Sequence, residues 1–393
     1  MQHLFLFDIC RFVILLHERN SKMSKKEIYH HIENNSDFKG LKVNAGIPQP
    51  ESVNHESVKR FLNKSRNLLP VNDYVKGILN GDITLLSKAV TLVESANAKH
   101  QQLAQDIITQ CLPHSGKSIR VGITGVPGVG KSTFIEALGM YITKQGGKLA
   151  VLAIDPSSER TKGSILGDKT RMEELSGDRN AYIRPSPSAG SLGGVARKTR
   201  ETIILCEAAG FNHIFIETVG VGQSETAVHS MTDFFLLLML AGAGDELQGI
   251  KRGIMEMADI IAINKADGNN IEKAQMAKVQ YNNAIHLFPK KDSEWDPKVL
   301  TCSASVKTGI SEIWDQIENY KELTKQNGYF AAKRNQQATY WMHETIQEQL
   351  KRNFYDNPEI KHKIKELEKL VLEDKLSSFM AAGLLLQMHS KLK

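Results

Sequence analysis

An apolar stretch that runs directly into a glycine-rich loop constrains this chain more than any other feature. Residues 121–133 read Val-Gly-Ile-Thr-Gly-Val-Pro-Gly-Val-Gly-Lys-Ser-Thr, which contains the pattern Gly-x-x-x-x-Gly-Lys-Ser. Glycines let successive backbone N–H groups turn inward around phosphate oxygens, and a helix that begins at about Ser132 points its positive end at the same anion. A strand, this loop and a helix in that order predict a P-loop, which binds a nucleoside triphosphate.

The side chains of the loop have roles that follow from their chemistry. Lys131 supplies a positive charge for the β- and γ-phosphates, and the Ser132 hydroxyl is placed to bind Mg²⁺. The alternative is a glycine-rich turn without a ligand, but the flanking strand and helix favour the P-loop. We therefore expect the nucleotide to contact the whole loop, which consists of Gly125, Val126, Pro127, Gly128, Val129, Gly130, Lys131, Ser132 and Thr133.

A second motif indicates which base is bound. The apolar run 258–267 ends in Asn-Lys-Ala-Asp. A carboxylate at Asp267 can accept from both N1–H and the 2-amino group of guanine, whereas adenine has an acceptor at N1 and no 2-amino group. Asn264 suits the O6/N7 edge of guanine, and the stem of Lys265 can pack along the base. The motif favours GTP over ATP, and a solvated turn in which Asp267 caps a helix is the alternative.

A third segment agrees with guanine binding. Residues 299–303 read as a further strand, and Ser303-Ala304-Ser305 at its end could close its backbone over the guanine O6. By itself this segment is a weak indicator. We expect Ser303, Ala304 and Ser305 to join Asn264, Lys265 and Asp267 in the nucleotide site.

Composition sets the class of protein. The chain has 393 residues, of which 41% are hydrophobic and 24% charged, as in a globular protein with a large core. The net charge of +6 is small and its basic residues are scattered, so nucleic acid is not an expected partner. The four cysteines lie far apart with no Cys-x-x-Cys pair, which fits a reducing cytoplasm. Three of the four (Cys10, Cys111, Cys206 and Cys302) lie in apolar stretches and should be small buried hydrophobes.

The N-terminal part divides into two predicted segments. Residues 1–73 read as a largely irregular leader. Its apolar run at 4–16 is too short to span a bilayer and lacks the features of a secretory signal, so we expect residues 1–22 to be a non-native start. Residues 74–117 have helical periodicity, with Asp82 as the expected N-cap of one helix.

The rest of the chain predicts an α/β fold with helices at its end. Residues 118–323 alternate apolar strands with helices, which predicts a mostly parallel P-loop NTPase sheet with helices on both faces. Residues 324–393 read as helices that either pack on this domain or form an intersubunit dimerisation arm. The expected strands are 119–124, 149–155, 214–218, 234–240, 260–264 and 299–303, with a further candidate at 181–184.

Acidic residues follow two of the predicted strands. Glu217 precedes Gly220 by three residues, and in this position a carboxylate can hold Mg²⁺ while the glycine N–H donates to the γ-phosphate. Asp155 ends another strand and could bind the metal or cap the next segment. Asp168 could reach the metal and Arg171 a phosphate, although both could instead face solvent.

Two segments suggest a switch. Val221 stands where a Ras-like enzyme has its water-orienting Gln, and Gln223 comes two residues later, so we expect slow hydrolysis that depends on a rearrangement or a partner. The glycine-rich segment 241–251 follows a strand end. It could be a turn with a capping box formed by Asp245 and Gln248, or a mobile element that senses the γ-phosphate and reports to a partner.

Taken together, these motifs resemble the MeaB/ArgK-type GTPases of the SIMIBI group, which include the methylmalonic aciduria type A proteins. Members of this family are chaperones of adenosylcobalamin-dependent methylmalonyl-CoA mutase. The resemblance covers the chain from about residue 74 into the C-terminal helices. The motifs that carry it are 125–133, 155–158, 163–172, 184–188, 217–225, 242–251 and 264–267.

The resemblance implies a homodimeric GTPase that binds the mutase, gates loading of adenosylcobalamin from the adenosyltransferase and helps to expel damaged cofactor. The cobalamin would lie on the partner and not on this chain. Two features depart from the family pattern, namely the extension 1–22 and the loose base-closing segment 301–305. The resemblance also implies three sets of residues. The Mg²⁺ site would consist of Ser132, Asp155, Asp168 and Glu217, and the catalytic residues would be Lys131, Asp155, Asp168 and Glu217. The switch that contacts the mutase would contain Gly244, Asp245, Gln248 and Lys251.

Other classes remain open. A GTPase metallochaperone for nickel enzymes would need a Cys/His cluster near the switches or a His-rich tail, whereas His229 stands alone. A P-loop kinase would use ATP, which Asp267 disfavours. A scaffold that binds GTP without hydrolysing it, or a chaperone of isobutyryl-CoA mutase, would have the same motifs.

Overall fold

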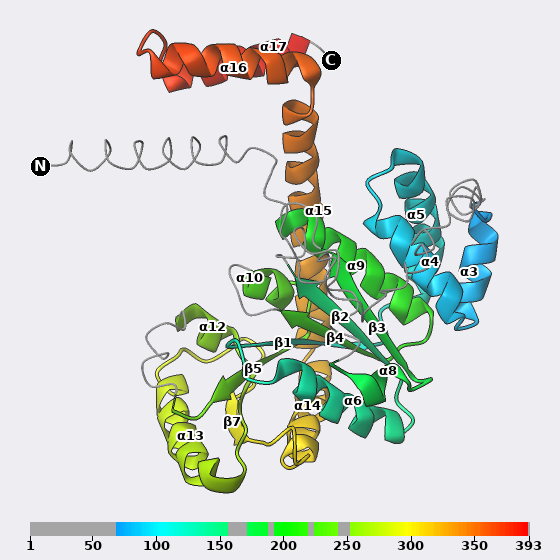
Figure 1. The fold of residues 1–393 in the computed structure, drawn as a ribbon, viewed down its shortest axis with the longest axis vertical. Coiled ribbons are helices and arrows are strands. Elements are labelled where there is room, and N and C mark those ends of the chain that lie inside the picture. The colour runs from blue at the N-terminus through cyan, green and yellow to red at the C-terminus, as the bar shows by residue number, and fades with distance from the viewer. Residues whose placement is uncertain (1–67, 156–170, 188–191, 219–223, 243–251, 392–393) are drawn as a thin grey trace, which may run out of the picture. The chain divides into compact units, whose positions relative to one another are not determined.

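The computed structural model describes residues 68–155, 171–187, 192–218, 224–242 and 252–391. Residues Leu69–Lys393 form one unit, and the preceding unit, Met1–Leu68, lies almost entirely outside the described ranges. Seven parallel strands form one sheet in the order β3-β2-β4-β1-β5-β6-β7 (Figure 1). The strands are β1 (Ile119–Gly125), β2 (Leu149–Asp155), β3 (Ala181–Pro187), β4 (His213–Thr218), β5 (Phe234–Leu240), β6 (Ile260–Asn264) and β7 (Lys298–Thr301).

The predicted parallel α/β sheet is therefore confirmed, and the bounds of β2, β5 and β6 agree with the prediction. The strands β1 and β4 are each one residue longer than predicted, and β7 and β3 differ more. The strand β7 begins at Lys298 and ends at Thr301, where 299–303 was predicted; beyond it the N–H of Ala304 donates to the side chain of Asn264 and not to a backbone carbonyl of β6. The strand β3 continues to Pro187, three residues beyond the predicted candidate 181–184, and so contains prolines at 185 and 187. Because β3 is an edge strand, a proline can replace an N–H that has no partner strand to bond.

Helices cover both faces of the sheet. On one face, α6 (Lys131–Lys144), α8 (Glu173–Ser176) and α14 (Ile310–Gln326) pack on the odd-numbered side chains of β1. On the other face lie α9 (Leu192–Ala208) and α10 (Ser224–His229). Beside β5, β6 and β7 are α12 (Arg252–Met257), the short helix η3 (Gly268–Asn270) and α13 (Ile271–Ile285).

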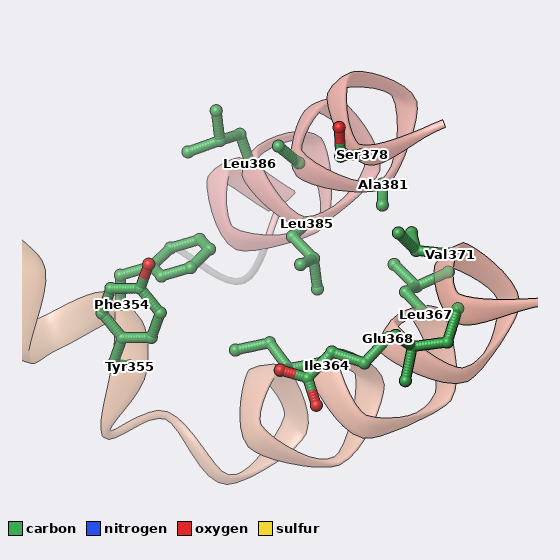
Figure 2. A pocket seen from close by; sticks show the side chains of 12 residues that line it. Phe354, Tyr355, Ile364, Leu367, Glu368, Val371, Ser378, Ala381, Leu385 and Leu386 are labelled. Atoms are coloured by element: carbon green, nitrogen blue, oxygen red, sulfur yellow. The ribbon is translucent and has the colours of Figure 1, made fainter. Parts of the chain in front are cut away.

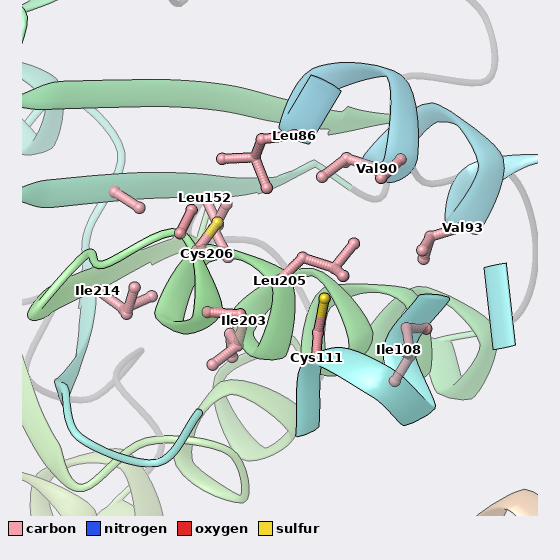
Figure 3. Packing of buried hydrophobic residues seen from close by; sticks show 14 of the residues in the cluster. Leu86, Val90, Val93, Ile108, Cys111, Leu152, Ile203, Leu205, Cys206 and Ile214 are labelled. Atoms are coloured by element: carbon pink, nitrogen blue, oxygen red, sulfur yellow. The ribbon is translucent and has the colours of Figure 1, made fainter. Parts of the chain in front are cut away.

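The expected helical element before the P-loop is present and packs against α9. It consists of α3 (Val71–Leu79), α4 (Ile83–Glu94) and α5 (Ala98–Cys111), followed by the 3₁₀ turn η2 (Leu112–His114). Asp82 caps α4 as predicted, since its carboxylate accepts from the N–H groups of Thr84 and Leu85. Figure 3 shows Leu86 and Val90 of α4 in the same cluster as Leu205 of α9.

The three described cysteines are buried, as predicted. Each is a free thiol, and burial raises the pKa of Cys111 to about 11 and that of Cys302 to about 12. The pKa of Cys206 is raised even further by its burial. These thiols therefore behave as small apolar side chains and are poor nucleophiles.

The C-terminal region is helical, as predicted. It contains α15 (Tyr329–Tyr355), α16 (Pro358–Leu372) and α17 (Ser378–Lys391). Asn357 ends the turn after α15 and caps α16, because its side chain accepts from the N–H groups of Glu359 and Ile360. The predicted divisions after residues 73 and 323 fall inside α3 and α14, and the domain organisation stays a prediction. Within the part of the chain that is described, we find no helix with the length and apolar character needed to cross a membrane.

Candidate functional site

The P-loop lies between the carboxyl end of β1 and the start of α6, at the centre of the sheet. In an open parallel sheet this is the edge at which ligands bind, and β1 is where the connections change direction. Gly128 (φ 76°) and Gly130 (φ 90°) have left-handed backbone conformations, which favour glycine. The sequence prediction of strand, loop and helix is confirmed, with the helix beginning at Lys131, one residue earlier than expected.

Gly125 is required for a different reason. A Cβ at this position would lie 2.4 Å from the carbonyl oxygen of Leu238 on the neighbouring strand β5. The first glycine of the loop therefore lets β1 and β5 approach each other at the strand end. Pro127, Gly128 and Thr133 are exposed, whereas Val129 is buried and anchors the loop to the core.

Lys131 points back along the loop. Its Nζ donates to the carbonyl oxygens of Gly125 (3.0 Å) and Val126 (3.4 Å). Burial lowers the pKa of Lys131, and the carboxylates of Glu217 and Glu225 act in the opposite direction. The ammonium group is thus held at the mouth of the loop, where phosphate oxygens could replace the two carbonyls as its partners.

Ser132 and Glu217 lie together, as predicted. The Ser132 hydroxyl donates to Glu217 Oε1 over 3.3 Å, and Glu217 is 8% exposed. One residue further along β4, Thr218 Oγ1 donates to Thr124 Oγ1 (2.8 Å), which joins the ends of β4 and β1. A hydroxyl beside a carboxylate is a pair of hard oxygen ligands of the kind that Mg²⁺ prefers.

The Asn-Lys-Ala-Asp motif begins at the last residue of β6 and is hydrogen-bonded to the P-loop. Asn264 Nδ2 donates to the carbonyl oxygen of Val129 (2.8 Å), and Lys265 Nζ donates to that of Gly128 (2.9 Å). Lys265 adopts a left-handed backbone (φ 59°), which is uncommon for a residue with a Cβ. The two predicted motifs, about 135 residues apart in sequence, are therefore parts of one site.

The third predicted segment meets the same motif. The N–H of Ala304 donates to Asn264 Oδ1 (3.0 Å), so the Asn264 amide is bonded on both sides. Asp267 accepts from the hydroxyl of Ser303 and, over 3.3 Å, from that of Ser305. Asp267 precedes η3 but its side chain caps nothing there, so the alternative of a capping carboxylate is wrong. The carboxylate is held in place by two hydroxyl groups instead.

The other predicted residues fall into two groups. Asp155 is the last residue of β2, at the same edge of the sheet, and Arg171 is exposed. The remaining predicted positions lie outside the described residues: Asp168, Gly220, Val221, Gln223, Gly244, Asp245, Gln248 and Lys251.

Sequence reasoning missed one carboxylate near the loop. Glu225 lies in the first turn of α10, is 6% exposed, and its charge acts on Lys131. It is the last residue of the motif 217–225, so its place in that motif was a signal. A charged residue in a polar stretch is usually exposed, so the burial of Glu225 could not be predicted from the sequence.

Comparisons with known proteins agree with this site. A family model described as "Methylmalonyl Co-A mutase-associated GTPase MeaB" matches residues 86–359. The chain is 48% identical over 317 residues to a probable GTPase of Mycobacterium tuberculosis, which covers 81% of this chain and 94% of that protein. It is 47% identical over 283 residues to GTPase ArgK of Escherichia coli (72% of this chain, 86% of that protein).

Two further similarities cover most of the chain. The methylmalonic aciduria type A homolog, mitochondrial, of Mus musculus is 47% identical over 321 residues (79% of this chain, 77% of that protein). The crystal structure of LAO/AO transport system kinase superposes with a TM-score of 0.66 and 36% identity, and the match covers 82% of this chain and 99% of that one.

Proposed function

This chain belongs to the MeaB family of P-loop GTPases, and we propose that it is a GTP-dependent chaperone of adenosylcobalamin-dependent methylmalonyl-CoA mutase. In this role the chain gates loading of the cofactor from the adenosyltransferase and protects or reactivates the mutase. The cobalamin stays on the partner. The family description and the name of the mouse relative support the choice of client.

One observation carries the nucleotide part of the proposal. Asp267 is fixed by Ser303 and Ser305, and Asn264 bonds both the P-loop and the 303–305 segment. A fixed carboxylate at this edge can accept from N1–H and the 2-amino group of guanine, and it would face a lone pair in adenine. The same side chains join the base and phosphate parts of the site, so GTP is the triphosphate that this geometry supports.

The residues present fit a magnesium ion. Ser132 and Glu217 would hold it, with Asp155 and Asp168 as further candidates. When bound, Mg²⁺ neutralises charge on the phosphate oxygens. The chain's own part is to bind the phosphates with Lys131 and the loop N–H groups, and to orient them by the helix that begins at Lys131. Gly220 and the segment 242–251 are proposed to sense the γ-phosphate and to contact the mutase through Lys251.

The C-terminal helices are proposed to form a homodimer. An apolar groove of about 650 Å³ lies between the end of α15 and the pair α16–α17, and Figure 2 shows Ile364, Leu367 and Leu385 directed into it. Among the residues that line the groove, Leu372 is 85% exposed, and Phe379, which does not line it, is 89% exposed. An apolar surface of this kind is typical of an intersubunit contact.

Two alternatives concern the client and not the nucleotide. A related acyl-CoA mutase, such as isobutyryl-CoA mutase, would use the same GTP site with a different contact surface. A GTPase metallochaperone for another metalloenzyme would share the fold. The buried free thiols Cys111, Cys206 and Cys302 agree with the proposal of a reducing cytoplasmic location.

The test is a binding experiment with purified partners. The chain is immobilised with a non-hydrolysable GTP analogue or with GDP, and apo methylmalonyl-CoA mutase, isobutyryl-CoA mutase and a nickel enzyme are applied in turn. We expect methylmalonyl-CoA mutase to bind in a nucleotide-dependent way and to accelerate GTP turnover. Equal turnover with and without this mutase, together with stronger binding of another enzyme, would contradict the choice of client.

A further inference from the structure

Three long side chains on α15 form a buried polar row, and none of the motifs accounts for them. Lys333, Gln337 and Trp341 are spaced four residues apart, so they lie on one face of the helix. Their exposed fractions are 9%, 7% and 8%. A helix face turned toward a core usually bears apolar side chains, and polar groups placed there need partners.

All three side chains of the row donate hydrogen bonds to carbonyl oxygens of one short turn. Trp341 Nε1 donates to the carbonyl oxygen of Ser230 (3.1 Å), Gln337 Nε2 to that of Thr232 (2.8 Å), and Lys333 Nζ to that of Asp233 (2.7 Å). These carbonyls belong to the turn 230–233, which joins the end of α10 to the start of β5. The order of donors along α15 is the reverse of the order of acceptors along the turn, so the two segments run antiparallel.

Two arginines complete the contact. Arg334 forms an ion pair with the Asp233 carboxylate (Nη2–Oδ2 2.6 Å). From α9, Arg200 Nη1 donates to the carbonyl oxygen of Gln337 (2.9 Å), and its guanidinium lies 5.5 Å from the centre of the Trp341 ring. The same stretch of α15 is therefore bonded to α9 and to the turn after α10.

These contacts fix the axial position of α15. A shift of the helix by one turn is about 5.4 Å, and it would separate every donor of the row from its acceptor at the same time. Because the groups are buried, water cannot replace the lost partners. The turn 230–233 and α15 are thus expected to move as one body rather than to slide past each other.

The unit formed by the turn 230–233 and α15 connects to two different parts of the chain. On one side, α10 begins at Ser224, directly after the segment with Gly220, and Glu225 in its first turn acts on Lys131 of the P-loop. On the other side, α15 ends at Tyr355, and two residues separate it from the start of α16 (Figure 1). A helix of 27 residues is about 40 Å long, so α15 can connect distant parts of the chain.

We propose that Lys333, Gln337 and Trp341 are positioning residues that couple α10 to the C-terminal helices, so that the bound nucleotide sets the state of α16–α17 through α15. The inference rests on the proposed response of the site to the γ-phosphate. It adds the route by which that response reaches the apolar surface of the C-terminal pair. It requires no contact of α15 with the nucleotide.

The test uses a double variant of the full chain, Trp341→Phe with Gln337→Met. Both changes remove a donor; Met has nearly the shape of Gln, and Phe keeps an aromatic ring, although a smaller one than the indole. Gln337 Oε1 is buried without a hydrogen-bond partner among the described residues, so its replacement by Met should be tolerated. The matched control is Tyr340→Phe with Gln347→Met, which changes exposed side chains of the same helix by similar chemistry. Thermal unfolding checks that both variants fold.

The readout is hydrogen–deuterium exchange in α16 and α17 with a non-hydrolysable GTP analogue and with GDP. In the wild-type chain and in the control we expect the exchange rates to differ by about fivefold between the two nucleotides, at the low end of typical coupling. In the double variant we expect this difference to fall below about twofold, while calorimetry shows unchanged GTP affinity.

Each outcome separates this inference from the proposed function. If GTP binds but α16–α17 exchange equally with both nucleotides in the wild-type chain, the coupling does not exist. If the difference survives in the double variant, the row does not carry it. If GTP itself does not bind, the proposed function fails, and the route through α15 fails with it for a reason that calorimetry identifies.

Discussion

The base-binding edge of the sheet and the C-terminal helix pair differ in how their side chains are satisfied. At the edge, Asn264, Asp267 and Ser303 are polar, and each bonds another residue of the same site. In α16–α17 the side chains around the groove are mostly apolar, and Leu372 and Phe379 are largely exposed. The polar groups of the edge therefore hold one another in place, whereas the helix pair has apolar surface that a second molecule could cover.

The comparison separates what the chain is expected to do alone from what it is expected to do with a partner. Side chains that are held in place by one another lose little freedom when a ligand binds, so nucleotide recognition should be intrinsic to the chain. An apolar surface gains free energy mainly by association, so the function of α16–α17 should depend on concentration and partner. The following changes test this division, beginning with the largest expected effect.

Replacement of Lys131 should have the largest effect. Its ammonium group lies within 3.0 Å of the Gly125 carbonyl, at the place where the phosphates are expected. We expect Lys131→Ala to reduce GTP turnover by about 100- to 1000-fold, because a fixed positive charge at the developing anion is lost. The control is Lys144→Ala at the exposed end of the same helix. Turnover within threefold of the wild type, measured by phosphate release, would refute the role of Lys131.

Asp267→Asn should change the choice of base. The change removes a charged acceptor for N1–H and the 2-amino group, so we expect GTP affinity to fall by about 100-fold. Xanthine has a carbonyl in place of the amino group, and the Asn amide can donate to it, so XTP affinity should rise. Asp296→Asn, at an exposed position, is the control. Calorimetry that finds an unchanged ratio of GTP to XTP affinity would argue against the placement of guanine.

The sequence predicted more of the base-binding edge than of the contacts made by α15. Apolar runs of five to seven residues are sufficient to predict buried parallel strands, and the base motif has one geometry that suits guanine. The polar row on α15 was not foreseen, because Lys333 and Gln337 read as exposed residues of a surface helix. Their burial depends on carbonyls about 100 residues earlier in the chain, and no local pattern reports such a contact.

The edge strand β3 also has a feature that depends on the whole fold and not on the local sequence. The sequence predicted a strand only over 181–184, yet Pro185 and Pro187 also belong to β3. A proline is excluded from the middle of a sheet but not from its border, and the position of β3 in the sheet order is a property of the whole fold.

A charge in the groove of α16–α17 should affect association and leave nucleotide binding unchanged. We expect Leu385→Asp to weaken self-association by at least about 30-fold, since a buried charge would replace an apolar anchor. Leu287→Asp is the control, because Leu287 is 79% exposed and lies outside the helix pair. Sedimentation velocity over a range of concentrations measures the effect. A monomeric wild type, or an unchanged dimer in the variant, would exclude this surface as the dimer contact.

Acid should weaken the sheet region in a way that depends on two histidines. Burial lowers the pKa of His213 to about 4, and it lowers that of His229 to about 4 with help from the Lys333 charge. The unfolded chain binds these protons below its ordinary pKa of about 6.5 and the folded chain does not, so the free energy of unfolding falls as the pH drops from about 6.5 to about 4. The slope is at most about 1.4 kcal/mol per pH unit for each group.

His213→Gln removes one of these titrations and should make the decline between pH 7 and pH 5 shallower. The His213 ring lies 5.1 Å from that of Trp314, so tryptophan fluorescence during urea unfolding reports on this part of the sheet. The control is His114→Gln, which changes an exposed histidine. If both variants lose stability as steeply as the wild type, the buried histidine does not contribute. A shallower decline only in His213→Gln would show that acid sensitivity belongs to the sheet, the region whose polar groups depend on each other, and does not require the C-terminal surface.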